Sequence, residues 1–96
     1  MARIRHEMPY DDVQQEELEA AGPALFGRMW QTQMADLMGE NTRYLSRCLE
    51  KPCNARLLDG HRKAIRHALV KRQAEIEKVL KLLDKHDAQI AKDWAA

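Results

Sequence analysis

The chain has few aromatic residues and no alternating runs of Val, Ile and Thr, the pattern that a half-buried strand needs. It holds one phenylalanine, two tyrosines and two tryptophans among 96 residues. Ala, Leu, Met, Gln, Glu, Lys and Arg, which favour helices, make up most of the remainder. These features exclude a β-sheet domain and predict an all-α fold.

Long apolar stretches are also missing, since a membrane-spanning helix needs about 20 consecutive apolar residues. The first ten residues carry basic side chains but are not followed by the apolar segment of a secretion signal. Two cysteines are too few for a disulfide framework, so we expect reduced thiols. We therefore expect a cytoplasmic protein without membrane contacts.

Prolines and glycines divide the chain into segments. Residues 1–9 are expected to form a flexible arm, because Pro9 disfavours helix at Met8. Asp11 or Asp12 can cap a short acidic helix over residues 10–21, which Gly22-Pro23 would end. A second helix is expected over residues 23–51, before Pro52.

The helix expected over residues 23–51 rests on apolar residues spaced three and four apart. Gly39 is its weak point, because glycine inside a helix costs about 1 kcal/mol relative to alanine. The following Glu40-Asn41-Thr42 fits either a continuous helix or a break with a new cap. We favour the continuous helix.

A long helix is expected over residues 54–94, with a heptad pattern. Its two sets of apolar positions are Leu69, Ile76, Leu83 and Ile90, which repeat every seven residues, and the partner positions Leu58, Ile65 and Val79. Arg72 and His86 interrupt the second set, which favours a buried stripe over a free parallel coiled coil. We expect a single domain over residues 1–96. Its predicted fold is a helical hairpin of two long amphipathic helices with a short N-terminal helix, completed to a bundle by self-association or a partner.

The net charge of +1 hides an uneven distribution. Acidic side chains outnumber basic ones over residues 1–40, and the remainder of the chain is basic. This fits either an acidic helix docked on the basic helix or two faces for two partners.

No catalytic residues, cofactor site or metal site is expected. Ser46 is the sole serine, and the four glycines are scattered rather than gathered in a phosphate-binding loop. The residues around the turn that resemble a zinc ligand set are Cys48, Cys53, His61 and His67. The histidines are six residues apart and point to different sides of a helix, which argues against zinc. We expect Cys48 in the core and the histidines exposed, with a Cys48–Cys53 disulfide as a less favoured alternative.

A basic stretch offers an alternative function, that of a small DNA-binding regulator. Its candidate nucleic-acid face is Arg62, Lys63, Arg66, Lys71 and Arg72. Few charges are involved and the domain is not basic overall, so we place this interpretation second.

The favoured function is a non-enzymatic protein–protein interaction module: an adaptor, chaperone-like protein or assembly factor, which forms a homo-oligomer or binds a helical partner. The expected interface residues are Phe26, Trp30, Met34, Leu37, Ile76, Leu83, Ile90 and Trp94. The segment with Met29, Met34 and Met38 is either core or a groove for a partner helix. In layout, residues 44–83 loosely resemble helical-hairpin proteins that serve as small bacterial co-chaperones or assembly factors, although no residue motif carries the resemblance.

Overall fold

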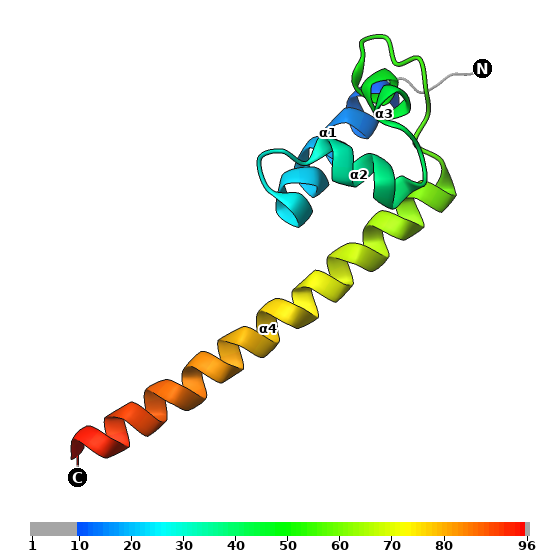
Figure 1. The fold of residues 1–96 in the computed structure, drawn as a ribbon. Coiled ribbons are helices and arrows are strands. Elements are labelled where there is room, and N and C mark those ends of the chain that lie inside the picture. Colours follow the sequence, from blue (N-terminus) through cyan, green and yellow to red (C-terminus); the bar gives the residue numbers. More distant parts are fainter. Residues whose placement is uncertain (1–9, 96) are drawn as a thin grey trace.

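The computed structural model describes residues 10–95, and this part of the chain forms four helices (Figure 1). They are α1 (Tyr10–Phe26), α2 (Gln31–Met38), α3 (Thr42–Leu49) and α4 (Asp59–Ala95). The all-α prediction is therefore confirmed for these residues. The arm expected at residues 1–9 lies outside them. No helix among the described residues is long and apolar enough to cross a membrane.

The molecule consists of a small cluster of helices and a long projection. Helices α1, α2 and α3 gather around the first part of α4, and the rest of α4 leaves them as a straight helix (Figure 1). We call residues 10–69 the head and residues 70–95 the rod. The principal dimensions are 71 × 29 × 21 Å, and α4 contains 37 residues, about 55 Å of helix at ~1.5 Å per residue.

The first helix is longer than predicted. We expected it to end at residue 21, but α1 runs through Gly22-Pro23 to Phe26. Pro23 is exposed, so water can bond to the carbonyl that loses its helical donor. Gly22 packs against the Trp30 ring, which leaves no room for a side chain. The helix ends where Gly27 adopts a φ of +79°.

The single helix predicted over residues 23–51 is wrong. Its first residues belong to α1, and the remainder is divided into α2 and α3. Gly39, at a φ of +73°, ends α2 with its N–H directed at the Asp36 carbonyl, and Glu40 N donates to Ala35 O over 2.9 Å. Asn41 then caps α3 by accepting from Tyr44 N at 2.8 Å. Of the two long helices expected, only α4 forms.

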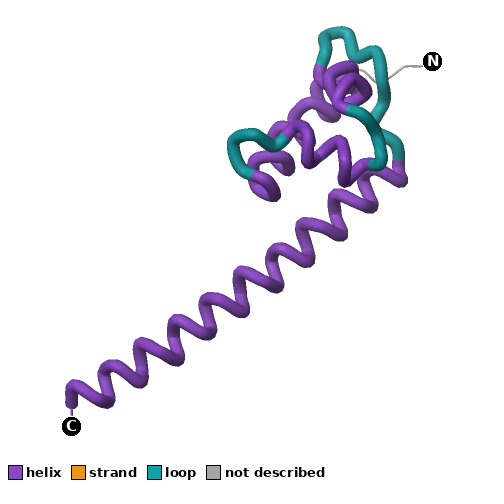
Figure 2. Tube along the Cα trace, in the orientation of Figure 1, coloured by secondary structure: helices purple, strands orange, loops and turns teal. Residues whose placement is uncertain are grey.

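The last helix begins at Asp59 rather than at residue 54. Figure 2 shows the connection from α3 as a loop. Backbone N–H groups in this loop donate to α3 and α1 instead of to the carbonyl four residues earlier: Asn54 N donates to Arg47 O at 3.0 Å, and Leu57 N to Gln14 Oε1 at 2.7 Å. These bonds hold the loop in a non-helical conformation until Asp59.

The core lies entirely within the head. α1 contacts the other three helices, and α2 also contacts α3 and α4. Fully buried apolar side chains come from the first three helices, namely Leu18, Met34, Ala35, Leu45 and Cys48. Among the α4 side chains that the structure describes, residues 59–94, only His61 and Ile65 are buried. The rod contributes nothing to the core.

Candidate interaction surface

An apolar stripe runs along the rod. Its residues, which we call the α4 stripe, are Ile76, Val79, Leu80, Leu83, Ile90 and Trp94. The first five are 51–55% exposed and Trp94 is 87% exposed. Because they recur at three, four and seven residues, they share one face of the helix. Large apolar side chains gathered on one exposed helix face are typical of a surface that binds another helix.

The α4 stripe continues the face that α4 buries in the head. Ile65 is buried against the core, and Val79 lies two heptads further along the same face. Leu69, at the end of the head, is followed at seven-residue steps by Ile76 and Leu83. Among the described residues, α1 and α2 cover this helix face at its start, and beyond Arg72, which bonds to α1, the face is exposed.

The structure divides the predicted interface residues into two groups. Ile76, Leu83, Ile90 and Trp94 lie on the α4 stripe. The other four lie in the head, where Trp30 and Met34 are buried and Phe26 and Leu37 are half-buried against the core. Met34 has no exposed surface, so it is not available to a partner in this conformation.

The methionine-rich segment is mainly core. Met34 and Met38 are buried, whereas Met29, in the turn before α2, is 84% exposed. The alternative of a methionine-lined groove for a partner helix therefore has no support from Met34 or Met38.

The acidic first helix docks on the basic part of the chain, which answers a question that the sequence leaves open. Arg62 on α4 forms an ion pair with Glu17 on α1. Lys51 Nζ lies 3.0 Å from Asp12 Oδ1. At the other end of α1, the Arg72 guanidinium donates to the Leu25 carbonyl over 2.9 Å, which satisfies a carbonyl at the helix C-terminus.

The candidate nucleic-acid face is partly used by these contacts. Arg62 and Arg72 bind α1, and Arg72 also lies 3.8 Å from the Glu75 carboxylate. Lys63, Arg66 and Lys71 are exposed. Binding to phosphates by all five side chains would thus compete with the contacts that hold α1 on α4.

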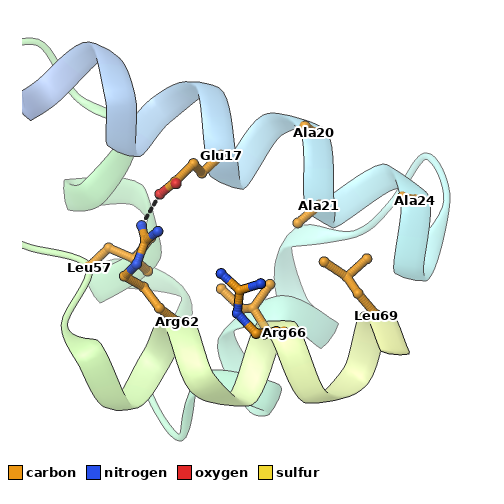
Figure 3. A pocket seen from close by; sticks show the side chains of 9 residues that line it. Glu17, Ala20, Ala21, Ala24, Leu57, Arg62, Arg66 and Leu69 are labelled. Atoms are coloured by element: carbon orange, nitrogen blue, oxygen red, sulfur yellow. Dashed lines mark hydrogen bonds and ion pairs between the residues drawn. The ribbon is translucent and has the colours of Figure 1, made fainter. Parts of the chain in front are cut away.

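A groove of about 430 Å³ lies between α1 and α4 (Figure 3). Its α1 side is formed by the small side chains of Ala20, Ala21 and Ala24. On the α4 side, Arg66 and Leu69 extend toward α1. The walls are mostly apolar, and the groove lies where the head meets the rod.

Two glutamines of α1 hold the loop between α3 and α4. Gln14 is buried, and its amide nitrogen donates to the carbonyls of Cys48 at 2.8 Å and Ala55 at 2.9 Å. Its amide oxygen accepts from Leu57 N. Gln15 donates to the carbonyls of residues 49 and 50 at 2.9 and 2.8 Å. Side-chain amides thus replace the backbone partners that the loop lacks.

His61 joins the start of α4 to the junction between α2 and α3. Its Nδ1 accepts from Leu58 N at 3.1 Å, so the ring proton belongs on Nε2, which lies 2.9 Å from Glu40 Oε2. The ring also makes an edge-to-face contact with Tyr44 at a centroid distance of 5.4 Å. We had expected an exposed polar histidine here, and that is wrong, because the ring is buried by these contacts. His67 is exposed, as expected.

Both cysteines are free thiols. Burial, together with the nearby Cys53 thiol and Glu40 carboxylate, raises the pKa of Cys48 from 9.0 to about 11. Burial and the charge of Asp11 also raise the pKa of Cys53. The Cys53 thiol donates to the Cys48 carbonyl at 3.0 Å. Both thiols are thus protonated at neutral pH, whereas a zinc ligand is a thiolate. Within residues 10–95, no cluster of three or more His, Cys, Asp and Glu side chains is placed to hold a metal ion.

The raised pKa of Cys48 predicts a loss of stability in alkali. Between pH 9 and 11 the unfolded chain loses the thiol proton while the folded chain keeps it, so the free energy of unfolding falls as pH rises. The expected contribution at pH 11 is a loss of about 2 kcal/mol. Urea titrations at pH 8 and 11 should show a smaller decrease for Cys48→Ala than for the unsubstituted chain. Equal decreases would contradict the assignment to Cys48.

Sequence reasoning missed the two glutamines and the groove. A signal for Gln14 was present, since it is in phase with Leu18, Ala21 and Leu25 on the apolar face of α1. The groove had no such signal, because it depends on how α1 sits against α4.

Comparisons with protein-family models, with curated proteins and with solved structures found no match to this chain.

Proposed function

We propose that this chain is a non-enzymatic protein–protein interaction module that associates with a second copy of itself through the α4 stripe. The observation that carries the proposal is that six large apolar side chains share one face of the rod and are more than half exposed among the described residues. Most of the stability of a helix in a protein comes from packing its apolar face, and the described residues leave the α4 stripe exposed. A second helix on the stripe supplies that packing.

Leu83→Glu is expected to weaken association about 100-fold, because Leu83 lies in the middle of the α4 stripe and a carboxylate buried there would have no partner. Light scattering across a concentration series measures the mass. The matched control is Ala88→Glu, which adds the same charge on the opposite face of the rod. The control should associate like the unsubstituted chain.

Two results would overturn the proposal. One is a monomeric mass for the unsubstituted chain at every concentration. The other is an equal loss of association in Leu83→Glu and Ala88→Glu, which would show that charge rather than the α4 stripe governs assembly. Circular dichroism of both variants verifies that α4 remains helical.

A further inference from the structure

The α4 stripe has an apolar groove at one end and the exposed Trp94 at the other. We infer that two copies pair their rods antiparallel, so that Trp94 of each copy enters the groove between α1 and α4 of the other. This inference rests on the proposed self-association and adds its geometry and a second contact site. Three observations on the chain support it: the charge pattern, the spacing and the shape of the groove.

The charges along α4 favour the antiparallel orientation. A parallel pair in register would oppose each residue with its own copy, so that Arg72 would face Arg72 and Asp87 would face Asp87. Residues 62–72 contain basic but no acidic side chains, whereas residues 84–93 contain three aspartates and two lysines. An antiparallel pair brings Asp93, near the end of each rod, beside Lys71 and Arg72 of the other copy. The helix dipoles also oppose each other favourably in this arrangement.

The spacing of Leu69 and Trp94 allows both grooves to be filled at once. These residues stand at the two ends of the exposed face, twenty-five positions apart, or about 37 Å along the helix. Leu80 and Leu83 flank the midpoint between them. When a two-fold axis passes through that midpoint, each Trp94 lies level with Leu69 of the other copy. Leu80 of one copy then packs on Leu83 of the other.

The groove suits a flat apolar side chain. Small alanines on α1 leave a space of about 430 Å³, in the size range of pockets that hold small organic groups. Tryptophan is among the side chains that contribute most at protein interfaces. Arg66 lines the same groove, where it would meet the negative end of the arriving helix.

Ala24→Glu tests the groove directly. Ala24 is exposed, so the change leaves the core untouched, but the carboxylate would occupy the space meant for Trp94. The dissociation constant of the dimer, from light scattering or sedimentation, should rise at least tenfold. Trp94→Ala should have a similar effect. The control Gln33→Glu adds the same charge at an exposed position of α2 outside the groove. It should change the dissociation constant less than twofold.

Quenching by iodide reports where Trp94 lies. In the dilute monomer Trp94 is exposed and should be quenched, whereas Trp30 is buried. Above the dissociation constant, quenching of Trp94 should be lost in the unsubstituted chain and retained in the Ala24→Glu variant. Full quenching of Trp94 in the unsubstituted dimer would overturn the groove contact.

A nitroxide at residue 92 measures the orientation. Lys92→Cys is made in a Cys53→Ser background, because Cys48 is buried and unreactive. Antiparallel rods should hold the two labels about 30 Å apart, whereas parallel rods would bring them within about 15 Å. A short distance would overturn the inference and leave the proposed function intact, as would unchanged affinity in Ala24→Glu. A monomeric unsubstituted chain would overturn both.

Discussion

Gln14→Leu is expected to lower the free energy of unfolding by about 3 kcal/mol, because the change removes three hydrogen bonds from a buried site. Leucine has nearly the same volume and is apolar, so the packing of α1 is largely retained. The carbonyls of Cys48 and Ala55 and the N–H of Leu57 would lose their partner. Each such buried group costs about 1 to 3 kcal/mol, part of which the buried leucine side chain offsets. Urea denaturation measures the sum.

Two companion variants separate hydrogen bonding from packing. Gln33→Leu, on the exposed face of α2, makes the same chemical change outside the core and should alter stability by less than about 0.5 kcal/mol. Gln14→Glu keeps an oxygen for Leu57 N but turns the other oxygen toward two carbonyls, so it should destabilise as well. If Gln14→Leu cost less than about 1 kcal/mol, the loop would have other partners for these groups.

Loss of the Gln14 hydrogen bonds should loosen the loop between α3 and α4 before it unfolds the whole head. These bonds reach residues on both sides of the loop that connects α3 to α4. Loosening the loop should speed amide hydrogen exchange at Cys53 and Leu57 before the rest of the head opens. Cys53 N also donates to Asp11 Oδ2 at 3.0 Å, so α1 holds this loop at two points. The acidic helix therefore stabilises the connection rather than only neutralising basic charge.

The sequence predicted the helical class and the heptad face of α4, because a long, regular pattern suffices for both. It failed over residues 23–51 for a physical reason. Met34, Met38, Leu45 and Cys48 remain in phase across the break at Gly39, so periodicity alone does not reveal it. The break is set by the positive φ of Gly39 and by the cap at Asn41. Of the two alternatives at Gly39, a continuous helix or a break with a new cap, only the break fits the tertiary packing.

The candidate surface could be predicted only where it lies on one helix. Ile76, Leu83, Ile90 and Trp94 follow from spacing along α4 alone. Trp30 has the same apolar character but is buried, because the turn at Gly27 folds α2 back onto α1. The spacing of apolar residues predicts that a side chain will be buried by another element. The tertiary fold determines whether that element belongs to the same chain.

That distinction separates the two parts of the molecule. The head satisfies its apolar side chains internally, through Leu18, Met34 and Leu45. The rod leaves its apolar side chains exposed, although α4 runs without a break from the head into the rod. Mutations in the head should therefore change the stability of a single chain, whereas mutations on the α4 stripe should change association.

Gly22→Ala is expected to cost about 2 to 3 kcal/mol, because a Cβ there would lie 2.0 Å from Trp30 Cε3 and 2.2 Å from Cδ2. Contacts this short force the indole ring out of its buried position. Alanine favours the helix over glycine by about 1 kcal/mol, which offsets only part of the strain. Urea denaturation gives the loss. A red shift of Trp30 emission, measured with Trp94→Phe to remove the rod's signal, should accompany it.

A double-mutant cycle assigns the loss to the ring. In a Trp30→Leu background the smaller side chain makes room, so adding Gly22→Ala should be neutral or stabilise by up to about 1 kcal/mol. Gly60→Ala is the matched control on α4, since nothing lies within 4 Å of its added Cβ, and it should also be neutral or stabilising. If Gly22→Ala were equally harmful with and without the indole, the helix backbone rather than Trp30 would be what requires glycine. If Gly22→Ala did not reduce stability in the unsubstituted chain, the Trp30 ring could move without cost. The packing of α2 against α1 would then be looser than the burial of Trp30 implies.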